Sequence, residues 1–192
     1  MRASANKILG GELQRAAWGV ALLLAVAALP GCHSSIARGQ TMYLSSISFQ
    51  DGSQIPEKFT CSGEGLSPQL AWGAPPARTK SLALIVTDPD APRRTFTHWV
   101  FYDLPPETRT LTEGVPGVGL LTDGALQGRN DFGEIGYGGP CPPPGSPHHY
   151  VFTLFALDAK LNLPVGEKRA QVEAAMQGHI LGSGRLVGLY QR

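Results

Sequence analysis

Apolar and polar residues alternate with the two-residue period of β-strands along most of the chain after residue 42. Turn residues such as Asp-Gly and Pro-Pro separate these patterns. The predicted strands are 43–49, 58–60, 69–72, 82–87, 98–103, 149–157 and 186–190. The segment 82–87 is apolar on both faces, which predicts a central strand. A helix is predicted at 167–178, ending at Gly178. This order predicts a mainly β fold, a sandwich with peripheral helices.

The first 31 residues have the pattern of an export signal. Three basic residues precede a short apolar segment, 16–29, which is too short for a membrane-spanning helix. The segment ends in Leu-Pro-Gly-Cys, which resembles a bacterial lipoprotein cleavage box. The sequence therefore predicts a lipoprotein-type signal peptide at 1–31, lipidation of Cys32, a tether at 32–41 and one domain at 42–192.

The cleavage box leaves a second interpretation open. Pro30 stands where lipoprotein signals usually have a small residue, so ordinary cleavage near Gly31 or Gly39 would give a soluble periplasmic protein. Both interpretations predict export. If Cys32 is lipidated, His33 after it favours the outer membrane over the inner one, because an Asp at that position is the usual signal for inner-membrane retention.

The charge balance excludes one class of partner. The whole chain carries a formal charge of +1. Without residues 1–31, which hold three basic residues and one acidic residue, 13 basic and 14 acidic residues remain. A nearly neutral domain gives no electrostatic reason to expect nucleic acid as a partner. Contact with a membrane is expected only through the lipid anchor.

The most informative stretch is GRNDFGEIGYGGPCPPPGSPHHYVFTLFALD, residues 128–158. It joins a loop rich in glycine and proline to the longest strand pattern. Glycines can bring a backbone close to a ligand, and prolines stiffen the loop. Exposed N–H groups beside His148, His149 and Tyr150 could hold an anion, although a structural loop with two surface histidines would show the same composition.

Several motifs together resemble a known family. SLALIVTDPDAP starts at Ser81 and HWVFYDLP at His98, while FTCSGEGLSPQLAW and GHILGSGRLVGLY start at Phe59 and Gly178. With the GYGGPCPP block, these motifs resemble the phosphatidylethanolamine-binding protein family, also called Raf kinase inhibitor-like proteins, and especially its bacterial YbhB/YbcL branch. The resemblance runs from about residue 42 to the C-terminus.

The resemblance implies a fold and a site. The fold is a β-sandwich of two antiparallel sheets with a small helical element near the C-terminus. The site is a pocket for a phosphate-bearing or other small anionic ligand, such as a phospholipid head group, without a cofactor. This branch of the family would also allow a homodimer. The pocket residues implied by the motif positions are Asp88, His98, His148 and Tyr150, with Gly138, Pro140 and Pro142 in the backbone wall.

The chemistry of these residues suits an anion, but each has a structural alternative. Imidazole and phenol groups donate hydrogen bonds to phosphate oxygens, and a buried carboxylate can fix the tautomer of a histidine and raise its pKa. Asp88 and Asp90 could instead cap their own turn, which we favour for Asp90. His98 could be a core residue, and His149 should point away from His148 on the strand. A metal site built from Asp88, His98 and His148 is a weaker alternative.

Two cysteines remain if Cys32 carries lipid. An even pair in an exported protein favours a disulfide, and Cys61 and Cys141 both lie in loops of the family motif. A catalytic Cys141 thiolate is the competing interpretation.

We therefore expect a binding protein and not an enzyme. A protein–protein regulator that uses the pocket rim, like the kinase and peptidase inhibitors of the family, is the first alternative. A hydrolase using Asp88 and His98 is the second. The chain has no G-x-S-x-G elbow, no Walker A loop and no dinucleotide-binding fingerprint.

Overall fold

A computed structural model describes residues 39–192. The predicted signal peptide, the lipidation of Cys32 and the tether up to residue 38 lie outside the described residues. The tether was predicted to extend to residue 41, but Gln40 and Thr41 already pair with the last strand of the fold. The folded domain therefore includes residues that the sequence assigned to the tether.

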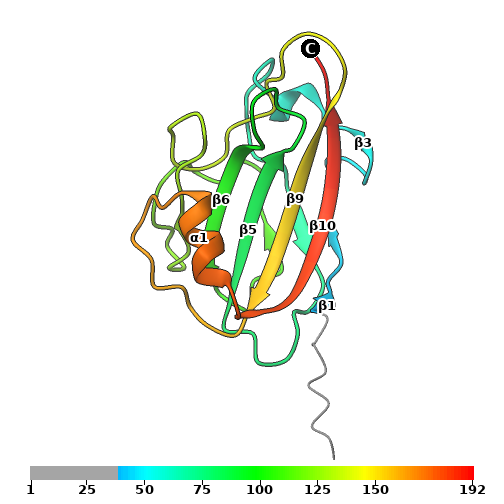
Figure 1. Cartoon of the computed structure of the whole chain (residues 1–192). Coiled ribbons are helices and arrows are strands. Elements are labelled where there is room, and N and C mark those ends of the chain that lie inside the picture. The colour runs from blue at the N-terminus through cyan, green and yellow to red at the C-terminus, as the bar shows by residue number, and fades with distance from the viewer. Residues whose placement is uncertain (1–38) are drawn as a thin grey trace, which may run out of the picture. The chain divides into compact units, whose positions relative to one another are not determined.

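Two sheets and one α-helix make up the described part (Figure 1). The larger sheet has the strand order β1-β10-β9-β5-β6-β8, with β3 also paired to β10, and the smaller one has the order β2-β4-β7. The strands are β1 (Gln40–Thr41), β2 (Leu44–Ser45), β3 (Ser53–Gln54), β4 (Leu70–Trp72), β5 (Ser81–Asp88), β6 (Phe96–Leu104), β7 (Thr110–Leu111), β8 (Leu126–Gln127), β9 (His148–Leu157) and β10 (Ile180–Tyr190). The helices are the 3-10 helix η1 (Glu57–Phe59) and the α-helix α1 (Arg169–Met176).

The predicted β-rich fold with two sheets and one late helix is confirmed. The long strands β6, β5, β9 and β10 pair antiparallel in that order. One detail differs from two purely antiparallel sheets, because the short strands β1 and β3 both pair parallel with β10. Within residues 39–192, no helix is long and apolar enough to cross a membrane.

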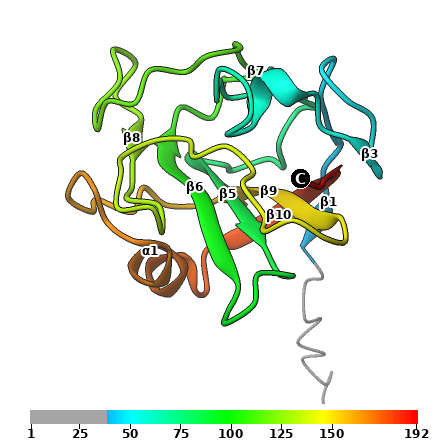
Figure 2. The ribbon, with the colours of Figure 1, turned by 90° about the horizontal axis from the view of Figure 1, so that it is seen from above.

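The central strand β5 is buried on both faces of the large sheet, as its apolar pattern predicts. Leu82, Leu84 and Val86 of β5 pack in the core shared with the small sheet. Ala83 and Ile85 pack in a second core with Val172 and Met176 of α1, on the other face. Figure 2 shows the resulting layers. The helix α1 lies on one side of the strands β5 and β6, and β7 lies on the other side. Successive side chains of a strand point to opposite faces, so one apolar strand fills two cores.

Two predicted strands near the N-terminus are short or absent. The segment 43–49 contains only the two-residue strand β2, because the Ser46 hydroxyl bonds the Gln69 carbonyl and accepts the Ser48 N–H, which turns the chain. The predicted strand 58–60 is wrong. Residues 57–59 form η1 instead, and the Thr60 hydroxyl closes this turn on the Glu57 carbonyl.

The last strand is much longer than predicted. The sequence predicts a strand only at 186–190, but β10 begins at Ile180. A Cβ on Gly182 would lie 2.5 Å from the Gln40 carbonyl oxygen, and one on Gly184 would lie 2.7 Å from that of Met42. These glycines allow the N-terminal segment to approach β10 closely. This contact explains why a strand forms here although glycine has a low β-propensity.

The predicted helix is present but shorter, and it ends two residues before Gly178, whose φ is 81°. This conformation suits glycine and ends the helix as predicted.

A disulfide joins Cys61 to Cys141 across a sequence separation of 80 residues. The Cys61 N–H also donates to the Pro140 carbonyl at 3.0 Å. The disulfide and this hydrogen bond attach the proline-rich loop before β9 to the turn that follows η1.

We predict that the double substitution Cys61→Ala, Cys141→Ala lowers the free energy of unfolding by up to about 4 kcal/mol, because the cross-link restricts the unfolded chain. Urea denaturation of the oxidised protein and of the variant measures this difference. Unchanged stability, or two free thiols in the oxidised protein, would contradict the prediction.

Candidate functional site

A cavity of about 130 Å³ lies at the end of the large sheet where β5 ends and β6 and β9 begin. Antiparallel pairing brings these strand ends together, since Asp88 is opposite Phe96 and Thr87 is opposite Val151. The side chains that line the cavity come from the strands and from two loops. They are Asp88, Ala91, Pro92, Phe96, His98, Phe132, Cys141, Pro142, Pro143, His148 and Tyr150.

Five of the seven predicted ligand-binding residues line this one cavity: Asp88, His98, Pro142, His148 and Tyr150. Gly138 and Pro140 do not line it. The Gly138 carbonyl oxygen bonds Nδ1 of His98, and the Pro140 carbonyl accepts the Cys61 N–H. These two residues support the wall without forming its surface.

The Asp88 carboxylate uses both oxygens. Oδ1 accepts the Asp90 N–H at 2.8 Å and so closes the turn after β5. Oδ2 lies 2.7 Å from Nδ1 of His148. Asp88 is 3% exposed, so these bonds replace the water that the carboxylate loses on burial. Asp88 therefore has both of the roles that the sequence offered as alternatives, turn cap and partner of a histidine.

The prediction that Asp90 caps the turn is wrong. Its Oδ2 accepts the His149 N–H at 2.8 Å and lies 2.7 Å from Nδ1 of the same residue. The backbone N–H of His149, and then its ring, hold the pKa of Asp90 below its ordinary value. His149 does not line the cavity, as its position in the strand predicts.

His98 and Gly138 are joined by two hydrogen bonds. Nδ1 of His98 lies 2.7 Å from the Gly138 carbonyl oxygen, and the Gly138 N–H donates to the His98 carbonyl at 2.8 Å. His98 is 3% exposed, and burial lowers its pKa below the ordinary value of 6.5. The expectation that an acidic partner raises the pKa of a pocket histidine therefore fails for His98, because burial outweighs the raising effects of the Gly138 carbonyl and the Asp88 charge.

Tyr150 provides the clearest sign of a site for a polar ligand. It is 1% exposed, and its hydroxyl is the one buried side-chain oxygen or nitrogen of residues 39–192 without a hydrogen-bond partner. Burial raises the pKa of this phenol, and the Asp88 charge raises it further. The hydroxyl is therefore protonated and free to donate into the cavity.

Sequence reasoning missed two aromatic side chains of the site, Phe96 and Phe132. Their ring centroids are 4.7 Å apart, and each lies within 5.5 Å of the His98 ring centroid. Phe96 precedes His98 by two residues in β6, so the strand period could have revealed it. No local pattern identifies Phe132, whose loop is folded by Asn130, with Oδ1 accepting two N–H groups and Nδ2 donating to the Gly136 carbonyl.

The glycines of the wall serve a different purpose from the predicted approach to a ligand. A Cβ on Gly138 would lie 2.5 Å from Cδ2 of Phe132. Glycine is needed there because the phenyl ring packs directly on the backbone. The close approach predicted from sequence exists, but the protein's own aromatic side chain fills the space.

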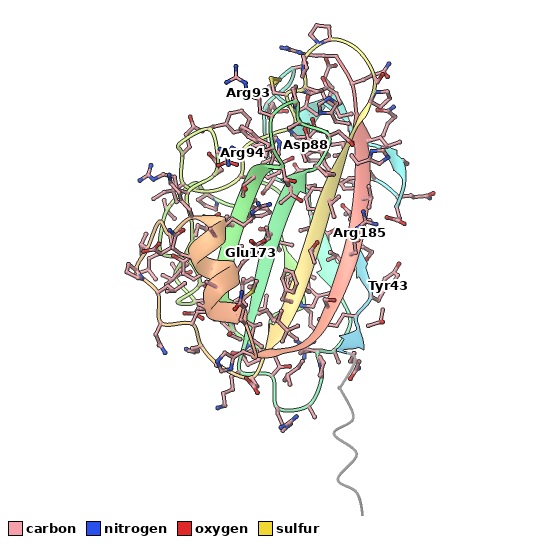
Figure 3. The ribbon with its side chains drawn as sticks, viewed as in Figure 1. Tyr43, Asp88, Arg93, Arg94, Glu173 and Arg185 are labelled. Carbon is pink, nitrogen blue, oxygen red and sulfur yellow. A yellow bond between two sulfur atoms is a disulfide. The ribbon has the colours of Figure 1, made fainter. Side chains whose placement is uncertain are left out.

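An open groove of about 330 Å³ adjoins the cavity, lined by Ala91, Pro92 and Phe96 together with two arginines. Figure 3 shows Arg93 and Arg94 at the same end of the sheet as Asp88. Arg94 pairs with Asp131 at 3.1 Å, and both arginines are exposed. Arg93 gives the rim a positive charge, whereas Asp131 offsets the charge of Arg94, and the cavity itself is lined by no lysine or arginine.

Two alternatives from sequence find no support in this geometry. Within the described residues, no group of three or more His, Cys, Asp or Glu side chains is placed to hold a metal ion. Cys141 lines the cavity but is bonded to Cys61, so it offers no thiolate.

A family model described as "Phosphatidylethanolamine-binding protein" matches residues 45–191. The chain belongs to this family. The phosphatidylethanolamine-binding protein fold covers nearly all of the described residues, and membership makes the chain a small-ligand-binding protein of this type.

Relatives and solved structures agree with this assignment. A UPF0098 protein of Methanothermobacter thermautotrophicus is 50% identical over 151 residues, which cover 79% of this chain and 99% of the relative. A putative phosphatidylethanolamine-binding protein homologue of Chlamydia trachomatis has a TM-score of 0.73 and 40% identity over 80% of this chain and 99% of its own. YbcL of Escherichia coli, a member of the same family, has a TM-score of 0.72 and 33% identity over 79% of this chain and 98% of its own.

We predict that burial of His98 destabilises the fold in acid. Its folded-state pKa lies below 6.5, so the folded protein binds fewer protons than the unfolded chain, and this residue's contribution to stability falls as pH drops below 6.5. Urea denaturation at pH 7.5 and 5.5 should show a larger loss of stability in the wild type than in His98→Asn. The His98 ring should titrate below 6.5 by NMR, and a midpoint above 6.5 would contradict the assignment.

Proposed function

We propose that the chain binds a small anionic ligand that carries a phosphate group and does not convert it. The unpartnered Tyr150 hydroxyl carries this proposal. A buried hydroxyl without a partner costs about 1–3 kcal/mol, and a phosphoryl oxygen in the cavity would accept its hydrogen bond. His148 supports the same ligand class, because its Nδ1 is held by the Asp88 carboxylate, which leaves Nε2 of the ring for a ligand.

The position of the charges also favours an anion. Arg93 of the adjoining groove places positive charge beside the cavity, and a positive rim raises the local concentration of anions. Inside the cavity, the ring of His148 is the group that can carry positive charge with a paired carboxylate behind it.

Binding without turnover fits the side chains that line the cavity. Among the described residues that line it, none is a serine, a threonine or a cysteine with a free thiol. A hydrolase would therefore need water, a histidine, Tyr150 or Asp88 as its nucleophile, and Asp88 already accepts two hydrogen bonds. An assay for hydrolysis of phosphate monoesters separates the two functions, and turnover that disappears in His98→Ala would contradict binding alone.

We predict that Tyr150→Phe weakens the binding of inorganic phosphate and phosphoethanolamine by about 1.5–3 kcal/mol, the range for a hydrogen bond to a charged group. The phenyl ring keeps the packing, so the loss reports the hydroxyl. His148→Ala should cost a similar amount. Isothermal titration calorimetry of these variants, with His149→Ala as a matched control outside the cavity, measures the difference.

The proposal fails if neither compound binds the wild type at any pH between 5 and 8. It also fails if Tyr150→Phe and His148→Ala both bind them as tightly as the wild type.

We further propose that the protein is exported and held on the periplasmic side of the outer membrane by lipid on Cys32. The leader pattern of residues 1–31 supports this location, and so does the disulfide, because such bonds persist mainly in oxidising compartments.

We predict that Cys32→Ala moves the protein from the membrane fraction to the soluble fraction, because lipid attachment requires the thiol. Fractionation and mass spectrometry of the mature N-terminus test this. A wild-type protein that is already soluble and starts at another residue would contradict it.

A further inference from the structure

The two imidazoles of the cavity are held by chemically different partners. Nδ1 of His98 lies 2.7 Å from the Gly138 carbonyl oxygen, which can only accept, so this nitrogen carries the proton. Nδ1 of His148 lies 2.7 Å from the Asp88 carboxylate and is also protonated. Each ring therefore has only Nε2 left for a ligand, and neither Nε2 bonds a described residue.

The two partners differ in formal charge. A carboxylate stabilises a protonated imidazole, whereas a carbonyl has no formal charge to offset it. His98 is also 3% exposed, and burial lowers its pKa. A His148 ring that is protonated on both nitrogens donates from Nε2, with the Asp88 carboxylate balancing its charge, while His98 stays neutral near pH 7 and presents a lone pair.

The cavity then offers the ligand two donors and one acceptor. The donors are the Tyr150 hydroxyl and Nε2–H of His148, and the acceptor is Nε2 of His98. No lysine or arginine lines the cavity to neutralise further negative charge. An oxyanion without hydrogen would place its lone pairs against that of His98, and a buried acceptor left without a partner destabilises the complex.

We propose that the cavity selects an oxyanion that keeps one O–H group, which His98 Nε2 accepts, and so prefers free phosphate and phosphate monoesters over sulfates and phosphodiesters. The inference rests on the proposed function. It makes His98 the specificity-determining residue and His148 and Tyr150 the anion-binding residues. A phosphate monoester loses its last proton near pH 6, so its protonated form is accessible at neutral pH. A sulfate ester or a phosphodiester has no such proton.

Calorimetry at pH 7 with four small probes tests the preference. Methyl phosphate and methyl sulfate have nearly the same size, so their difference reports the O–H group. Inorganic phosphate and dimethyl phosphate distinguish a free phosphate or monoester from the diester of a lipid head group. We expect phosphate and methyl phosphate to bind at least about 10-fold more tightly than methyl sulfate and dimethyl phosphate, the ratio for one unsatisfied polar group.

A substitution identifies the responsible residue. In His98→Gln the side-chain amide can rotate to offer a donor, so the ratio of methyl phosphate to methyl sulfate affinity should fall to within about 3-fold. His149→Ala, outside the cavity, should keep the wild-type ratio.

The wild-type measurement alone decides the inference, so a variant that fails to fold does not leave it open. If methyl sulfate or dimethyl phosphate binds as tightly as methyl phosphate, selection by His98 is wrong while anion binding stands. If none of the four probes binds, the proposed function fails together with the inference.

Discussion

The double hydrogen bond between His98 and Gly138 holds the site to the sheet. One bond runs from each residue to the other, so a strand residue and a loop residue satisfy each other's polar groups in a buried position. The loop that follows is then fixed at two further points, the Pro140 carbonyl and Cys141. Without this attachment, few contacts would hold the proline-rich segment over the end of β6.

The site also depends on the order of the strands. Residues 88, 98 and 150 are separated along the chain by loops of very different length, yet antiparallel pairing brings the end of β5 beside the starts of β6 and β9. The two apolar faces of β5 bury it between two cores, which gives the cavity a rigid floor. Asp88, the last residue of this strand, holds the ring of His148 in place through its carboxylate.

Sequence predicted the parts of the fold that rely on side-chain periodicity. The segments 82–87 and 149–157 are strands because their alternating residues face two cores, and this signal is local. The first half of β10 was missed, because its glycines allow a close approach of residues 40–42, which lie far away in the sequence. The wrong assignment of Asp90 has a similar cause, since only the position of residues 148 and 149 decides which carboxylate faces which histidine. Phe132 depends on the loop that Asn130 organises, and no periodic pattern encodes it.

The attached proline-rich wall has a consequence for the kinetics of exchange. Pro142 and Pro143 line the cavity directly beside Cys141, so the wall is restricted by ring geometry and by a covalent cross-link. A wall of this kind loses little conformational entropy when a ligand enters. Residence time in such a site is governed by the bonds made inside it, and the rate of arrival is governed by the charge at its entrance.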